Sequence, residues 1–246
     1  MASIRILTIL VYVIAVPHGI DSRENDYIDS DPIVAAPSPW PVGTYGLLMP
    51  TDGCPSTSIY FYTGQRKFDT EDSDPNNNWS SPCHLGGWYG KNNMELQFCI
   101  KTVLDVNENA WPAGEYCIFR FGGSCPYGMS EGRVGWDDED SDNENSHGGT
   151  LPDGVYDSNT HIDFCCQTSG SASASINLPT NDNFMLFQYN QYQCQEVDGM
   201  RATSEWFRWD TEDRNNEDYD TGSHPYKGVE DDNDDIKLHF CYYERI

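Results

Sequence analysis

Polar and apolar side chains alternate with a period of two in three well-separated segments of the chain. The residues that share one face are Met94, Leu96 and Phe98, then Thr160, Ile162 and Phe164, then Ile236, Leu238 and Phe240. Such alternation is typical of a β-strand with one face on a core. Segments 115–121, 184–189 and 204–209 are aromatic or β-branched and are bounded by Gly, Asn or Pro, which also predicts strands. No window of twelve residues shows a helical stripe, so we predict an all-β protein.

These segments belong to an internal repeat that occurs three times. The segment Trp40-Pro41-Val42-Gly43-Thr44-Tyr45 returns 71 positions later as Trp111-Pro112-Ala113-Gly114-Glu115-Tyr116, and Leu178-Pro179-Thr180 with Phe184 is a weaker third copy. Each copy then carries, in one order, a cysteine, an aromatic residue that leads an acidic cluster, a histidine and a closing Phe-Cys pair. The histidines are His84, His147 and His224, and the closing pairs are Phe98-Cys99, Phe164-Cys165 and Phe240-Cys241. This fixed order predicts three related units, about 40–104, 111–167 and 178–246.

Three similar β-units of this size cannot each bury an apolar face alone. We therefore expect them to pack around a pseudo-threefold axis as a β-prism, with a β-trefoil or a β-sandwich as alternatives. The second copy favours the prism, because parts of it are similar to the repeat of the vitelline membrane outer layer protein, whose family is a threefold β-prism. The similar parts are Cys125-Pro126-Tyr127-Gly128 through Gly132, Asp137-Asp138 and Asn159-Thr160-His161-Ile162.

Composition and the N-terminal residues limit the cellular compartment and the kinds of partner that are expected for this protein. The chain has 14 Lys and Arg against 40 Asp and Glu, a net charge of −26, which argues against binding to nucleic acid or to an anionic membrane surface. Arg5 followed by the apolar run Ile6–Val16 predicts a signal peptide over residues 1–20, too short to span a bilayer. The acidic, Pro-containing segment 21–39 is expected to be a linker, so the folded domain is 40–246. The mature protein is expected to be secreted into an oxidising, extracellular environment.

The nine cysteines follow the repeat. Each copy has an early and a late cysteine, which suggests the disulfides Cys54–Cys99, Cys125–Cys165 and Cys194–Cys241. The second copy adds Cys117 and Cys166, which are expected to pair with each other. Exchange of partners between copies is the main alternative, because spacing does not determine connectivity. Cys83 is left over, either as a free thiol or as a link to a second chain.

An acidic cluster recurs in each copy. The acids are Asp69, Glu71 and Asp72, then Asp137, Asp138, Glu139 and Asp140, then Asp210, Glu212 and Asp213. Calcium, which binds six to eight oxygens, is a candidate ligand, although no EF-hand loop is present. The alternative is a turn whose carboxylates cap backbone N–H groups. Zinc would need three or four converging ligands, and the cysteines are expected to be oxidised, so histidines that bond turns are favoured over zinc ligands.

Binding fits these residues better than catalysis. The acids look alike in all copies, whereas a catalytic pair needs two groups with different pKa values, and no hydrolase motif is present. We therefore predict that the protein is not an enzyme. Aromatic side chains that could hold sugars are Trp79, Trp88, Trp111, the Tyr189–Tyr192 loop and Tyr242–Tyr243, with no ligand-binding residue assigned among them. Asn78-Trp79-Ser80 is a sequon, so Asn78 is a candidate N-glycosylation site.

From Trp40 onward the chain resembles the apextrin C-terminal (ApeC) domain family of secreted invertebrate proteins. The matching segments include Gly53-Cys54-Pro55, His84-Leu85-Gly86, Trp136-Asp137-Asp138-Glu139-Asp140, Leu151-Pro152-Asp153-Gly154, Phe164-Cys165-Cys166, Asp198-Gly199-Met200, Trp209-Asp210-Thr211-Glu212-Asp213 and Phe240-Cys241-Tyr242-Tyr243. Cys83 lies outside the family pattern. The perforin-like domain that precedes the module in some relatives has no room here, so pore formation is not implied.

The resemblance implies a secreted innate-immune recognition protein that binds bacterial cell-wall glycans such as peptidoglycan. The alternative is a structural protein of the extracellular matrix or of cell adhesion. The expected partner is a bacterial surface glycan, with no nucleic acid and no membrane insertion, and Cys83 could link two chains. Calcium is the only candidate cofactor.

Overall fold

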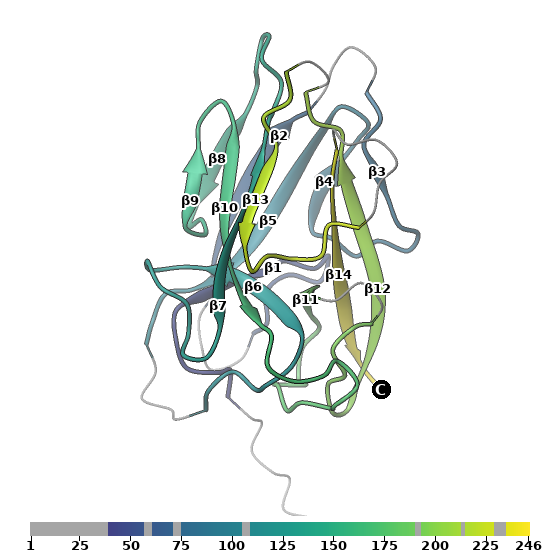
Figure 1. Ribbon diagram of the computed structural model, residues 1–246. Helices are drawn as coiled ribbons and strands as arrows, with labels where there is room; N and C mark the ends of the chain where they lie inside the picture. Colours follow the sequence, from purple (N-terminus) through teal and green to yellow (C-terminus); the bar gives the residue numbers. More distant parts are fainter. Residues whose placement is uncertain are drawn as a thin grey trace, which may run out of the picture. The chain divides into compact units, whose positions relative to one another are not determined.

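A computed structural model describes residues 39–56, 61–70, 75–104, 109–189, 193–212, 215–228 and 235–246. These residues form one curled, 14-stranded antiparallel sheet, and the described part of the chain contains no helix (Figure 1). The all-β prediction is confirmed. The predicted signal peptide, and all of the predicted linker except its last residue, lie outside the described residues. The described residues also include no helix long and apolar enough to cross a membrane.

Nine strands form three groups, and in each group the closing strand of a repeat lies in the middle. The groups are β1 (Tyr45–Leu48), β5 (Asn93–Lys101) and β2 (Phe61–Asp69); β6 (Tyr116–Arg120), β10 (Thr160–Gln167) and β7 (Ser130–Trp136); and β11 (Phe184–Gln188), β14 (Ile236–Arg245) and β12 (Met200–Trp209). The alternating segments are thus strands, as predicted. Because β6 also pairs with β1 and with β11, the three groups join into one sheet.

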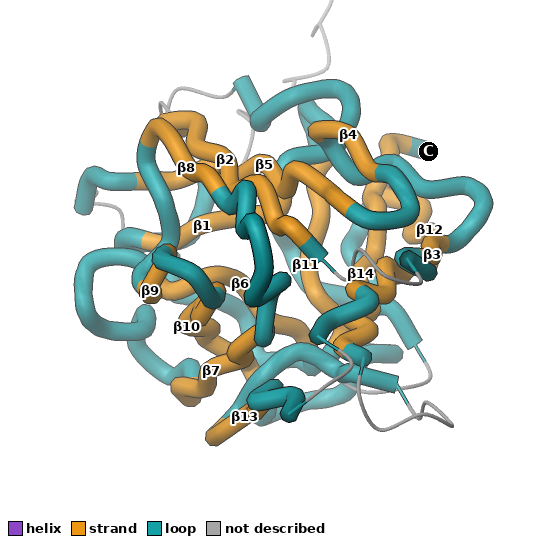
Figure 2. Tube along the Cα trace, turned by 90° about the horizontal axis from the view of Figure 1, so that it is seen from above, coloured by secondary structure: helices purple, strands orange, loops and turns teal. Residues whose placement is uncertain are grey.

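The five remaining strands extend these groups, and three of them come from a different repeat. β4 (Gly87–Tyr89) pairs with β5, and β9 (Gly154–Tyr156) pairs with β10, each within its own repeat. β8 (Ser146–Gly149) from the second repeat pairs with β2, β13 (Tyr219–Gly222) from the third pairs with β7, and β3 (Asn78–Trp79) from the first pairs with β12. Seen from above, the groups lie on different sides of the molecule (Figure 2). An added strand pairs backbone groups that a bare sheet edge would leave open.

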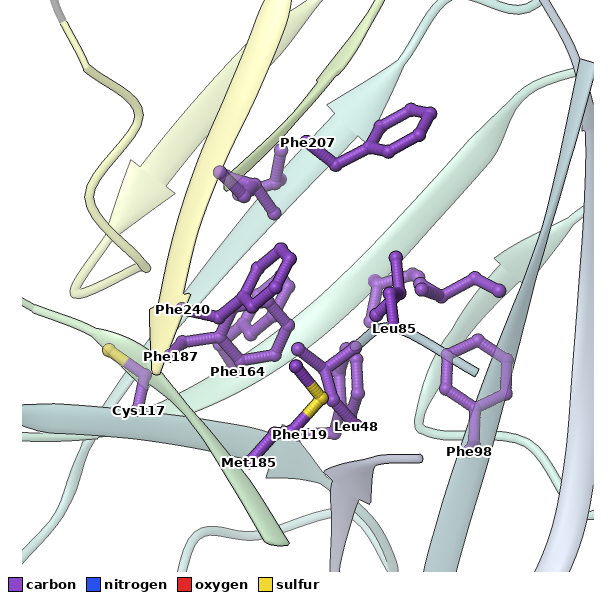
Figure 3. Close-up of a cluster of buried hydrophobic side chains, with 14 of the residues drawn as sticks. Leu48, Leu85, Phe98, Cys117, Phe119, Phe164, Met185, Phe187, Phe207 and Phe240 are labelled. Atoms are coloured by element: carbon purple, nitrogen blue, oxygen red, sulfur yellow. The ribbon is translucent and has the colours of Figure 1, made fainter. Parts of the chain in front are cut away.

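Two buried clusters fill the space between the groups. One gathers a phenylalanine from each of the strands β5, β6, β10, β11 and β14, namely Phe98, Phe119, Phe164, Phe187 and Phe240 (Figure 3). The other lies under the Trp-Pro segments and contains Trp40, Trp111 and Tyr45. The repeated tyrosine closes its own turn, because the hydroxyl of Tyr45 donates to the Pro41 carbonyl at 3.2 Å, as Tyr116 does to Pro112 at 2.6 Å.

Four disulfides tie the ends of the closing strands to the chain around them. They are Cys54–Cys99, Cys117–Cys166, Cys125–Cys165 and Cys194–Cys241, the same pairs that the repeat suggested, and each lies within one repeat. Each closes a loop with a sequence separation of 40 to 49 residues. In the chain-entropy model, a disulfide that closes a loop of this length stabilises the folded state by about 4 kcal/mol. Cys83 is the free cysteine and is half-buried.

Candidate functional site

The three aromatic residues that lead the acidic clusters meet inside the protein. Phe68, Trp136 and Trp209 are all buried, and their ring centroids lie 5.5 to 5.8 Å apart in all three pairs. Each comes from a different repeat. These separations are typical of stabilising aromatic pairs, so the acidic clusters begin at a shared core rather than on three independent loops.

The first aspartate of each cluster caps a backbone N–H group of another repeat. Asp69 accepts from the amide of Glu144 at 2.6 Å, and Asp137 accepts from that of Glu217 at 2.8 Å. Asp210 accepts from the amide of Asn76. The backbone amides of the three aspartates donate in turn to Asn145, Asp218 and Asn77. This is the turn-capping role that the sequence left open, except that each cap connects two repeats.

Two further acids of the clusters also accept from backbone amides. Glu139 accepts from the amide of Ser141 in its own turn, and Glu212 accepts from that of Asp140 in the second repeat. Among the described residues, no group of three or more His, Cys, Asp or Glu side chains is placed to hold a metal ion. Glu71, Asp72 and Asp213 lie outside the described residues, and calcium binding by the clusters stays a prediction.

Asp138 has a different role from the other acids. Its side chain is fully buried and accepts from the Thr160 hydroxyl at 2.6 Å, from Asn145 at 2.8 Å and from Arg66 at 3.3 Å. Burial raises the pKa of Asp138 to about 7, although Arg66 opposes the shift. We did not predict Arg66 as its partner. The alternation of β2 could have predicted a buried arginine, because Arg66 lies on the inward-facing side of the strand together with Gly64 and Phe68.

The repeated histidines lie in three different environments. The Nδ1 atom of His84 is 2.5 Å from the buried carboxylate of Glu205, and its ring stacks on Tyr242 at 4.1 Å. His224 bonds the carbonyl of Pro225 and pairs with Asp220. His147 lies on β8, and its ring is 6.0 Å from that of Tyr156. They do not form one site.

Most of the aromatic candidates for sugar platforms are part of the core. Trp111, Tyr242 and Tyr243 are buried core residues and therefore do not form sugar platforms. Trp79 is half-buried and stacks on Phe207, and Tyr189 packs on the core cluster. Trp88 is the exception, because 46% of it is exposed.

Trp88 lies on a polar sheet surface that we call the first face, the outward side of β4, β5, β2 and β8. One row across these strands contains Trp88, Glu95, Lys67 and Ser146, and the next row contains Gln97, Gln65 and Gly148. Gln97 donates to Glu95 at 2.9 Å, which places both on the same side of β5. Lys67 donates to Glu144 at 2.7 Å at the outer edge.

A shallow groove of about 410 Å³ crosses the second row. It is lined by Met49, Thr63, Gly64, Gln65, Gln97, Gly148 and Gly149. The neighbouring chain crosses Gly64 so closely that a Cβ atom there would lie 1.9 Å from the carbonyl oxygen of Thr150. Glycine is required at such a close backbone crossing. The groove therefore exposes amides, a hydroxyl and backbone beside an aromatic side chain.

Side chains occupy the matching surfaces of the other repeats. In the second repeat Arg133 pairs with Asp163 at 2.5 Å, and Arg120 pairs with the same carboxylate. In the third, the ammonium of Lys237 lies 4.3 Å above the ring of Trp206. The first face is thus the described surface that combines an exposed indole with an open polar groove.

Comparison with known proteins identifies the family. The model of the C-terminal domain of apextrin (ApeC) matches residues 40–243, which is most of the chain. No curated protein and no solved structure matches. The matched segment includes all four disulfides, the acidic clusters and the first face. The chain therefore belongs to the apextrin C-terminal domain family.

Proposed function

We propose that this protein is a secreted recognition protein that binds bacterial cell-wall glycans such as peptidoglycan through its first face. The observation that carries the proposal is the exposed Trp88 beside the groove lined by Gln65 and Gln97. An indole offers a flat apolar surface on which a sugar ring can pack, and side-chain amides both donate and accept hydrogen bonds. Ligand sites commonly combine aromatic surface with a few placed polar groups.

The four disulfides support an extracellular location. Disulfides form and persist in oxidising compartments and are rare in the cytosol. Asn78 is exposed on β3, so its sequon is accessible for N-glycosylation. A mobility shift on treatment with an N-glycosidase, absent in Asn78→Gln, tests this part of the proposal.

The arrangement of the repeats is proposed to be a threefold β-prism. Support comes from the contacts among Phe68, Trp136 and Trp209 and from the cyclic order in which each repeat passes a short strand to a neighbour. In such a scaffold each outward sheet face can change independently, because the inward side chains carry the packing.

Sedimentation with insoluble peptidoglycan tests the binding function. The full chain is expected to sediment, and Trp88→Ala is expected to weaken binding at least tenfold. Val155→Ala is the matched control, because Val155 occupies the same place on β9, pairs with His161 and is 40% exposed. Equal binding by Trp88→Ala and the parent would remove the first face from the proposal. Failure of the parent to sediment with peptidoglycan or with whole bacteria would refute the function itself.

We propose that the protein acts by binding rather than by catalysis. The described carboxylates that open the acidic clusters cap backbone amides instead of facing one another across a cleft. Release of muropeptides from purified cell walls would contradict this proposal.

A dimer linked through Cys83 remains a separate proposal. Cys83 is half-buried, and burial raises the pKa of its thiol, which lowers its reactivity. A non-reducing gel of the parent and of Cys83→Ser shows whether a linked dimer forms. A dimer band in the parent that is lost in Cys83→Ser supports it, and a monomer band in both refutes it.

A further inference from the structure

We propose that the first face recognises the uncharged N-acetylhexosamine backbone of a β-1,4-linked glycan and requires neither a peptide nor an anionic group on it. The inference rests on the proposed glycan-binding function and names its ligand chemistry. It predicts that the protein binds chitin oligomers as well as peptidoglycan.

The dimensions of the face fit a short stretch of sugar chain. Four strands, β4, β5, β2 and β8, lie side by side and present Trp88 and the groove on one surface. At the usual separation of neighbouring strands this surface is roughly 14 Å across. The groove volume of about 410 Å³ lies within the range of small-molecule sites. A ligand can therefore contact the indole and the groove together.

The hydrogen-bonding groups in the groove suit an acetamido sugar. The side chains of Thr63 and Gln65 are exposed and make no hydrogen bond to other described residues, so each is available to a ligand. Gln97 lines the groove, and its amide nitrogen donates to Glu95. An acetamide needs both an acceptor for its N–H and a donor for its carbonyl, and side-chain amides supply both.

Met49 supplies the apolar contact that an acetyl group needs. It is half-buried and lines the groove beside Gln97. A thioether side chain is flexible and polarizable, and it packs well against small apolar groups. Removing the acetyl methyl would leave this surface uncovered, so unacetylated glucans should bind less tightly.

Charge on the first face disfavours anionic ligands. Lys67 is the cationic side chain of the two rows, and its ammonium is already 2.7 Å from the carboxylate of Glu144. Glu95 lies between Lys67 and Trp88 and adds a second carboxylate. One ammonium therefore faces two carboxylates, in a chain whose net charge is −26. A phosphate-rich polymer would be repelled, whereas a neutral backbone would not.

Titration of the full chain with soluble oligosaccharides tests the inference. The ligands are the N-acetylglucosamine hexamer, the glucose hexamer with the same linkage, the deacetylated hexamer and lipoteichoic acid. The deacetylated hexamer is titrated in high salt, because its ammonium groups would otherwise be attracted to the acidic chain. We expect the N-acetylglucosamine hexamer to bind at least tenfold more tightly than each of the other three. Trp88→Ala and Gln97→Ala should each weaken its binding at least fivefold, and Val155→Ala should leave it unchanged.

The outcomes separate the two proposals. Binding of peptidoglycan without binding of the N-acetylglucosamine hexamer would overturn the ligand chemistry and leave the proposed function standing. Tighter binding of lipoteichoic acid, or of the deacetylated hexamer, would also overturn it. Binding of neither peptidoglycan nor the hexamer would refute the proposed function and this inference with it. A hexamer whose affinity is equal in Trp88→Ala, Val155→Ala and the parent would show that it binds elsewhere.

Discussion

The outward faces of the first and second repeats have the same backbone and different chemistry. In the first, Gln65 lies opposite Gln97, and in the second, Arg133 lies opposite Asp163 at the same distance from the inner aromatic residue. The amide pair leaves an open groove, whereas the ion pair, joined by Arg120, covers the corresponding surface. The two faces thus differ in chemistry at the same backbone position.

The two repeats also show at which positions the residue type cannot change. Gly64 and Gly132 occupy equivalent positions, and at each the backbone of the neighbouring repeat crosses so closely that a Cβ atom would overlap it. Outward residues are therefore free to diverge, while positions at which one repeat crosses another are restricted by sterics.

Gly64→Ala should lower the free energy of unfolding by about 3 kcal/mol, because the new Cβ would lie 1.9 Å from a backbone oxygen that cannot move away locally. Gly132→Ala should have a similar effect, since its Cβ would lie 2.1 Å from the carbonyl oxygen of Ser223. Urea unfolding measures both. Gly148→Ala is the control, with no atom within 4 Å of the added Cβ, and should stay within about 0.5 kcal/mol. Parent-like stability of Gly64→Ala would contradict the described crossing.

Asp163→Asn should destabilise the second face by about 2 kcal/mol. Asp163 is buried and pairs with Arg120 and Arg133, so removing its charge leaves two guanidinium groups without their shared partner. Hydrogen bonding to Asp163 raises the pKa of Arg133 in the parent. The guanidinium also stays charged in the variant, because arginine keeps its proton in proteins. Thermal unfolding in low and high salt provides the measurement. A change below about 0.5 kcal/mol would mean that the pair contributes little more than a surface salt bridge.

The pH dependence of stability should differ between the parent and Asp138→Asn. The first repeat has Thr70 where the second has Asp138, and burial raises the pKa of Asp138 from 3.8 to about 7. Because the folded state holds this proton more tightly than the unfolded state, the stabilisation is complete below about pH 4 and is lost as the pH rises through about 7.

Between pH 5 and 7 the parent should lose about 1 kcal/mol per pH unit from this group, measured by urea unfolding at fixed ionic strength. Asp138→Asn should show a flatter profile over the same range. Identical slopes in parent and variant would show that Asp138 does not titrate there.

Gln65→Ala should have the smallest effect on stability, within about 0.5 kcal/mol, because the side chain is exposed and forms no hydrogen bond to other described residues. Urea unfolding beside Asp163→Asn provides a direct contrast between the two faces. A loss as large as that of Asp163→Asn would show that the groove is part of the packed scaffold rather than an open surface.

Local patterns were sufficient for much of the scaffold. The alternation around Leu96, Ile162 and Leu238 predicted the three central strands, because the period of two is a property of each strand alone. The order of cysteines within each copy suggested disulfide pairs without excluding exchange between copies, and the structure has the suggested pairs. The aspartates that open the acidic clusters were correctly associated with turn amides, but not with amides of a neighbouring repeat.

Less of the candidate site could be predicted from the sequence. Trp88 was one of several aromatic candidates, and nothing in the local pattern distinguished it from the buried Trp111. The groove depends on β8, which comes from the second repeat and lies beside β2 of the first. Arg66 and Asp138 are 72 residues apart, and neither has a local pattern that identifies the other as its partner.

The all-β class, the three related units, the residues that close each unit and the cysteines within it can be predicted from the chain alone. These features follow from side-chain periodicity and repeat order, which are local properties. The neighbours of each strand, and with them the exposed aromatic residue and the groove, emerge only when the chain folds. Strand pairing joins segments far apart in the chain through backbone hydrogen bonds, and because every residue type can form these bonds, the side chains do not identify the partner strand.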